Sequence, residues 1–289
     1  MNREEIAVIA KYFVLTIFLF VACLGTAVAG FIYNDIPSPL PAHLPSQPFQ
    51  AQQTAEFGDL IQFAGTNRAL TNVTVVLDDG AKAADWLGSC PVSSSCTVSG
   101  WMHPITLNLY NVDNSGSNPA PGTLIAARTQ TFAIPWNPGV NSGLSFTVSF
   151  DFTGVTVPNQ IIYGVAYNTQ TWGAPPIGVP GPFISLNVGV NNSGGPAPYG
   201  PPSVGSRPFP DTAYWNTSTG SLYADNGVGG VGIFRRDTGW TPYSAAASFE
   251  TADVSALLAT PVPTLSAWML MFLVLVMLGF GVQRARKGR

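Results

Sequence analysis

Charged residues are scarce in this sequence, and histidine and cysteine are scarcer still. Only 9% of the 289 residues are charged, the net charge is −3, and there are 2 histidines and 3 cysteines. The middle of the chain is acidic and has no cluster of Lys and Arg. Nucleic-acid binding needs such clusters to neutralise phosphates. We therefore expect no nucleic-acid partner.

The sequence also lacks the short motifs of common catalytic sites. There is no G-x-S-x-G elbow, no H-E-x-x-H zinc motif, no C-x-x-C pair and no G-x-x-x-x-G-K phosphate loop. His43 lies in a proline-rich segment, so a Ser-His-Asp or Cys-His relay in the predicted domain would have to use His103. We expect no enzyme activity, no cofactor and no metal site. A surface hydrolase with two convergent Asp residues remains an alternative.

Two of the three cysteines lie close together in a polar stretch that is rich in turn-forming residues. Cys90 and Cys96 belong to GSCPVSSSCTVSG, and their spacing permits a small disulfide ring in an oxidising compartment. A pair of free thiols is the alternative. For an exported chain, we predict the disulfide.

The two longest apolar runs lie near the ends of the chain, and the first has the features of a signal peptide. Arg3 and Lys11 precede the run, and the small residues Ala27 and Ala29 flank Val28 after it. This pattern predicts a signal peptide over residues 1–29, cut by signal peptidase before Gly30. The alternatives are an uncleaved anchor and a lipoprotein attached through a cysteine in the run.

The second apolar run is long enough to cross a membrane. Residues 265–282 contain no charge, which predicts a transmembrane helix. The basic tail, residues 283–289, contains Arg284, Arg286, Lys287 and Arg289. By the positive-inside rule this tail stops translocation and stays in the cytoplasm, so the middle of the chain lies outside the plasma membrane.

A short motif at residues 262–268 overlaps the beginning of this apolar run. It consists of Val262, Pro263, Thr264, Leu265, Ser266, Ala267 and Trp268. With the single span and the basic tail, it resembles the IPTL-CTERM class of bacterial sorting signals, relatives of PEP-CTERM tails. That class usually begins Ile-Pro-Thr-Leu-Ser-Glu-Trp, so Val262 and Ala267 are departures. The resemblance covers residues 260–289 and implies that an exosortase-like membrane enzyme cuts or transfers the chain there; a permanent tail anchor is the alternative.

Between the two ends, apolar and polar residues alternate as in half-buried strands. LSFTVSFDF, residues 144–152, alternates without a break. Similar runs separated by Gly, Pro, Asn and Asp occur at residues 70–77, 105–110, 123–134, 161–167 and 183–190. They predict a mostly β fold, a single antiparallel β-sandwich or jelly-roll-like domain over residues 54–259. The proline-dense residues 30–53 are expected to form an extended arm that leads to it.

Tryptophan is plentiful in the middle of the chain and suggests a possible ligand. We selected Trp172 and Trp215 as candidates for stacking on the sugar rings of an extracellular polysaccharide, with core packing as the alternative. The function we predict is an exported surface protein with a structural, adhesive or matrix role. A carbohydrate-binding module and the Asp-based hydrolase are the alternatives.

Overall fold

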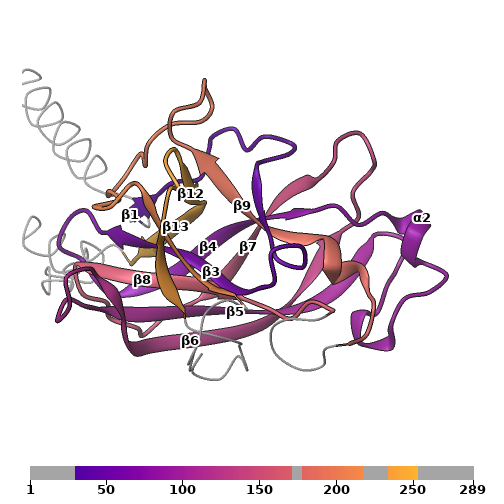
Figure 1. Cartoon of the computed structure of the whole chain (residues 1–289), viewed down its shortest axis with the longest axis horizontal. Helices are drawn as coiled ribbons and strands as arrows, with labels where there is room; N and C mark the ends of the chain where they lie inside the picture. Colours follow the sequence, from indigo (N-terminus) through magenta and orange to yellow (C-terminus); the bar gives the residue numbers. More distant parts are fainter. Residues whose placement is uncertain (1–29, 171–177, 218–233, 253–289) are drawn as a thin grey trace, which may run out of the picture. The chain divides into compact units, whose positions relative to one another are not determined.

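Two antiparallel sheets make up the described part of the computed structural model, which covers residues 30–170, 178–217 and 234–252 (Figure 1). The first sheet runs in the order β1 (Gly30–Asn34), β13 (Ala247–Thr251), β4 (Leu70–Asp79), β9 (Leu186–Asn192) and β12 (Tyr243–Ala245). In it, β2 (Ser46–Pro48) also pairs with β9, and β7 (Leu144–Asp151) also pairs with β4. The second sheet runs in the order β11 (Arg235–Thr238), β10 (Thr212–Thr217), β3 (Thr54–Gln62), β8 (Gln160–Ala166), β5 (Gly100–Asp113) and β6 (Ala120–Pro135).

Helical structure in these residues is limited to short turns. They are the α-helical turn α2 (Ala83–Trp86) and two 3-10 turns, Val92–Ser94 and Pro182–Ser185. The prediction of a mostly β, antiparallel fold is therefore confirmed. None of the described helices is long and apolar enough to cross a membrane. The predicted signal peptide, span, sorting motif and basic tail all lie outside the described residues.

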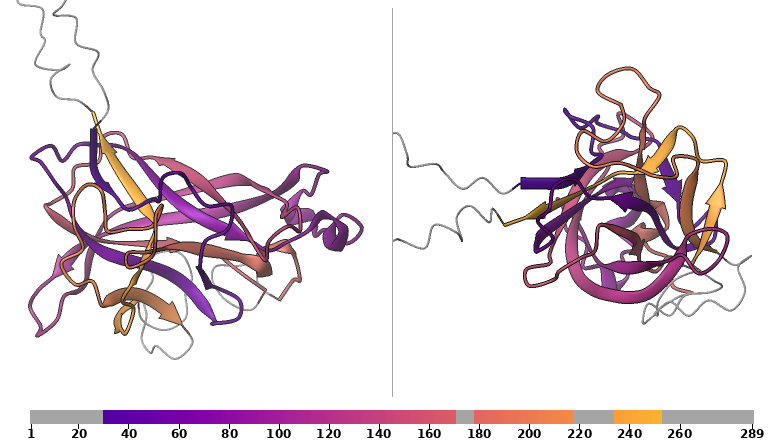
Figure 2. Two further views of the ribbon diagram at one scale, coloured as in Figure 1. Left: turned by 90° about the horizontal axis from the view of Figure 1, so that it is seen from above. Right: turned by 90° about the vertical axis from the view of Figure 1, so that its left-hand side faces the viewer.

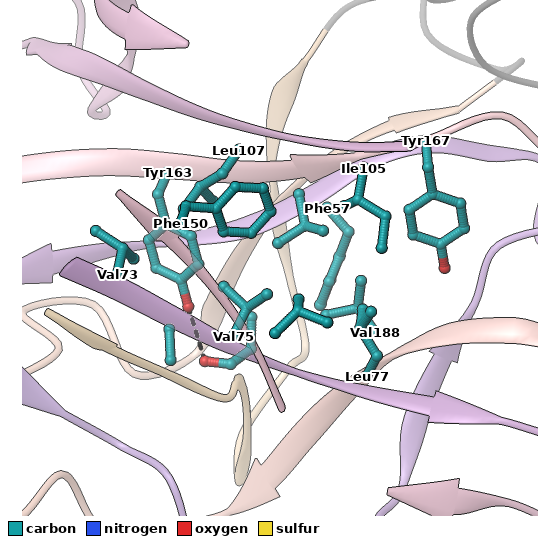
Figure 3. Close-up of a cluster of buried hydrophobic side chains, with 14 of the residues drawn as sticks. Phe57, Val73, Val75, Leu77, Ile105, Leu107, Phe150, Tyr163, Tyr167 and Val188 are labelled. Carbon is teal, nitrogen blue, oxygen red and sulfur yellow. Dashed lines mark hydrogen bonds between the residues drawn. The ribbon is translucent and has the colours of Figure 1, made fainter. Parts of the chain in front are cut away.

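The two sheets share one hydrophobic core, and the period-two pattern explains how it forms. Alternate residues of β4, β7, β5 and β8 supply side chains that meet between the sheets (Figure 3). On β7, Val148 and Phe150 are buried in this core as the alternation predicts. The hydroxyl group of Tyr163 on β8 donates a hydrogen bond of 2.8 Å to the carbonyl of Ala245 on β12, which links the sheets within the core (Figure 3).

Residues 30–53 belong to the same compact unit as the strands that follow them. Two short strands within this segment, β1 and β2, pair with β13 and β9 of the first sheet. Leu44 is fully buried and packs with Val76 and Ala246 in a small cluster of its own. The segment is extended, as expected of a proline-rich arm, but it packs against the first sheet instead of only leading to it.

The first and last described strands are neighbours. In the register of β1 with β13, Gly30 lies opposite Thr251. Figure 2 shows these two strand ends close together. The point where the described chain begins and the point where it ends are therefore adjacent on one edge of the first sheet.

Candidate functional site

The predicted disulfide is present and closes a small surface loop. Cys90 and Cys96 are bonded, with their Cα atoms 5.9 Å apart, in the connection between α2 and β5. The Cys96 backbone N–H donates a hydrogen bond to the Cys90 sulfur. The short 3-10 turn between the two cysteines lets the chain reverse within this ring.

The described tryptophans lie in or against the core. They are Trp86, Trp101, Trp136, Trp215 and Trp240. Trp215, on β10, is half-buried, and its ring meets Trp240 edge to face at a centroid distance of 6.0 Å. These contacts favour core packing over ligand stacking for Trp215. Trp172 lies outside the described residues.

A serine, a histidine and an aspartate from distant segments form one chain of hydrogen bonds. His43 Nδ1 lies 2.9 Å from Asp78 Oδ2, and His43 Nε2 lies 3.0 Å from Ser142 Oγ. Asp78 is 2% exposed, the His43 side chain is 35% exposed, and Ser142 is exposed. The chain of hydrogen bonds therefore runs from a buried carboxylate through an imidazole to a hydroxyl group in contact with solvent.

Strand pairing positions the carboxylate of this chain. Asp78 on β4 lies opposite Ser145 on β7 in the antiparallel register. The Ser145 hydroxyl donates a hydrogen bond of 2.9 Å to Asp78 Oδ2 and accepts the Leu44 N–H at 2.7 Å. The Ser145 N–H donates to the carbonyl of Ala42. The residues on both sides of His43 are thus hydrogen-bonded to Ser145, which explains why this serine is buried on the polar face of β7.

Glycine is required at position 143, next to the serine. A Cβ atom there would lie 1.9 Å from Asp78 Oδ1 and 2.6 Å from His43 Nδ1. Only a residue without a side chain lets the backbone pass this close to the Asp78–His43 pair. Asn137 fixes the other end of the loop, because its side chain donates to the carbonyl of Asn141 and accepts the Gly139 N–H. Together these contacts hold Ser142 within reach of His43.

His103 has a different environment from the one that a relay requires. Its ring is 3% exposed, stacks on Phe183 at a centroid distance of 5.2 Å and lies 3.1 Å from the Asn168 carbonyl through Nε2. Burial lowers the pKa of His103 to about 4. The sequence analysis considered only His103 for such a relay, whereas the hydrogen-bonded triplet contains His43.

A second polar cluster is almost completely buried and includes Asp59 of β3. Arg207 Nε lies 2.5 Å from Asp59 Oδ2, and both side chains are almost completely buried. Nearby, the Asp35 carboxylate accepts hydrogen bonds from Asn191 and Ser244, and burial raises its pKa to about 6. A buried ion pair without access to solvent is suited to fixing the core rather than to binding a ligand.

A third polar group lies on the face of the second sheet that points away from the core. Glu56 on β3 accepts hydrogen bonds from the Asn108 amide and the Tyr110 hydroxyl, both on β5. It reaches them across β8 at Gly164, where a Cβ atom would lie 2.1 Å from Glu56 Oε1. On β10, Asn216 lies opposite Glu56, and both polar atoms of its buried amide lack a partner among the described residues.

The chain matches no protein-family model, no curated protein and no solved structure. The functional argument is therefore based on the motifs in the sequence and on the geometry described above. Of these groups, the sequence analysis predicted the disulfide and missed the other three.

Proposed function

We propose that this chain is a bacterial exported protein of the cell envelope, with a structural, adhesive or matrix role that needs no catalysis. In this proposal signal peptidase removes residues 1–29, and an exosortase-like enzyme acts on the motif at residues 262–268. The domain between them has the two-sheet arrangement of a β-sandwich. The role in the envelope is inferred from the resemblance of the C-terminal segment to sorting signals.

The pairing of β1 with β13 is the observation that best supports this topology. Gly30, the first residue after the predicted cleavage site, already belongs to a strand and lies opposite Thr251. Cleavage before Gly30 would leave the fold intact. Because Gly30 and Thr251 are adjacent, the chain enters the domain and leaves it toward the proposed membrane segment at the same edge of the sheet.

The disulfide gives independent support for export. Cys90 and Cys96 are bonded, and structural disulfides persist in oxidising compartments outside the cytosol. In a reducing cytosol this surface ring would be exposed to reduction.

Intact-mass measurement of the protein recovered from its native cells tests the proposal. The expected species begins at Gly30, ends within or next to the sorting motif, and is two hydrogens lighter than the reduced form. A species that starts at Gly30 but retains Arg289 would favour the permanent anchor. Recovery of the complete chain with free thiols would refute export and processing together.

The binding of an extracellular polysaccharide is a second candidate function, and the row of Glu56, Asn108 and Asn216 is where we would test it. These three residues are fully buried, and Asn108 Oδ1 and both polar atoms of the Asn216 amide have no partner among the described residues. Buried amide atoms of this kind need a hydrogen-bond partner, and a sugar hydroxyl group that enters the row could both donate and accept. A glycan array would test this function. Loss of a glycan signal in Asn216→Ala, but not in the exposed-turn variant Asn114→Ala, would support this row; loss in Trp172→Ala or Trp215→Ala would support ring stacking instead.

A further inference from the structure

We propose that Ser142, His43 and Asp78 form a nucleophilic relay that hydrolyses carboxylic esters at the surface of this domain. This activity goes beyond the proposed envelope role, which does not require it. Ser142 lies on the loop before β7, His43 on the segment before β2, and Asp78 on β4. The two hydrogen-bond distances, 2.9 Å and 3.0 Å, are within the range expected for a serine relay.

The order of burial matches the roles that a relay assigns to each residue. The orienting carboxylate is buried, the base is half-buried, and the nucleophile is exposed to solvent. A chain of hydrogen bonds that only stabilised the fold would stabilise it most if both of its ends were buried. Here the serine hydroxyl at the outer end is open to a substrate.

The partners of Asp78 set the tautomer of the imidazole. Asp78 Oδ2 accepts hydrogen bonds, so the proton between it and His43 lies on Nδ1. Nε2 is then left with its lone pair directed at Ser142 Oγ, as a general base requires. Ser145 donates to the same carboxylate oxygen and holds it in place.

The reaction needs only an ester and water. Ser142 Oγ attacks the carbonyl carbon, and its proton moves to His43 Nε2. Collapse of the tetrahedral intermediate breaks the bond to the alcohol, which leaves with that proton. Water then attacks the acyl group on Ser142, gives its proton to His43, and releases the carboxylic acid as the serine recovers its own proton.

The surroundings of Ser142 favour a small acyl group carried on a larger molecule. Ser142 is exposed on the 136–143 loop, where an acetyl ester of a polymer hydroxyl can reach it. The depression of about 450 Å³ at the beginning of the same loop is lined by Lys82, Ala83 and Val98, and not by Ser142 or His43. The exposure of Ser142 is therefore the observation from which we assign the substrate class as short-chain acyl esters of large, hydroxyl-bearing molecules.

A fluorophosphonate probe tests the nucleophile directly in the full chain, produced in an exporting bacterial host and purified in detergent. The probe forms a Ser–O–P bond and releases fluoride, so one adduct per chain should be found by intact mass and mapped to Ser142. Ser142→Ala should lose the adduct, and the exposed-turn variant Ser117→Ala should keep it. His43→Gln should react at least about 100-fold more slowly, since general-base assistance contributes about that much or more.

Hydrolysis of 4-methylumbelliferyl acetate by the same proteins tests turnover. The proposal predicts more than one ester cleaved per chain by the unchanged protein and by Ser117→Ala, and loss of that turnover in Ser142→Ala. Three results would overturn it: no adduct at Ser142 under conditions that label a known serine hydrolase, equal labelling rates in His43→Gln, or labelling without turnover. Circular dichroism of each variant separates loss of the fold from loss of chemistry.

Discussion

Asp79 should make the stability of this domain depend on pH. It is the last residue of β4 and is fully buried. Its carboxyl group accepts hydrogen bonds from the Ala81 N–H at 3.0 Å and the Trp101 indole N–H at 3.2 Å. Burial outweighs these two bonds and raises the pKa of Asp79 from 3.8 to about 7.

The direction of the effect follows from proton linkage. Because the folded protein holds this proton more tightly than the unfolded chain, the free energy of unfolding falls as pH rises from about 4 to about 7. With pKa values of 3.8 unfolded and about 7 folded, the loss between pH 4.5 and pH 8 is about 3 kcal/mol. Other buried groups also titrate, so the contribution of Asp79 must be isolated by comparison.

The variant Asp79→Asn provides this comparison. Its amide cannot ionise, so its free energy of unfolding should vary with pH by about 3 kcal/mol less than that of the unchanged protein. At pH 4.5 the variant should be less stable by about 1 kcal/mol, because the amide oxygen replaces both acceptor oxygens of the carboxyl group. Urea unfolding followed by tryptophan fluorescence at the two pH values measures both effects. Equal pH dependence in the two proteins would refute the reasoning.

Three further changes test the packing of the domain. Gly164→Ala should destabilise it by roughly 2–3 kcal/mol, because the new Cβ would collide with the Glu56 carboxylate. The control Gly88→Ala, whose Cβ meets nothing within 4 Å, should be near neutral. Equal urea midpoints for the two variants would contradict this prediction. Arg207→Met leaves Asp59 buried without its ion-pair partner and should lower the free energy of unfolding by about 3–5 kcal/mol. The double variant Asp59→Leu/Arg207→Met should recover part of this loss. An unchanged free energy of unfolding in the single variant would mean that the pair is not enclosed. Cys90→Ser should lower the free energy of unfolding by about 2 kcal/mol, the loop-closure value for so short a ring. A reducing agent should lower the melting temperature of the unchanged protein but not that of the variant.

Period-two alternation is a local signal, so the sequence was sufficient to predict β4 to β9. The strands β1, β2, β3 and β10 to β13 were not predicted, and the run at residues 183–190 begins with the 3-10 turn Pro182–Ser185 before β9. Residues 144–152 alternate without a break, and β7 begins at Leu144 and ends at Asp151. Composition alone did not reveal the position of residues 30–53. Proline density predicts an extended backbone but not the surface against which that backbone packs, and the burial of Leu44 depends on Val76 and Ala246.

The Ser142–His43–Asp78 triplet could not be found from sequence, since its members are separated by 35 and 99 residues. No spacing rule connects them, and the prolines around His43 indicate an extended segment rather than a site. The register of β4 with β7 places Ser145 opposite Asp78, and Ser145 in turn anchors the segment that carries His43. The disulfide was predictable because both cysteines lie in one short loop and geometry leaves them few other arrangements.

The location of the domain is the central claim, and proteolysis in intact cells tests it most directly. A specific protease site placed in the exposed turn at residues 114–118, between β5 and β6, adds a cleavable bond outside the strands. We predict that protease added outside spheroplasts cuts the chain there, while a cytosolic marker protein stays whole. Resistance in spheroplasts, with cutting only after lysis of the plasma membrane, would contradict the proposed export.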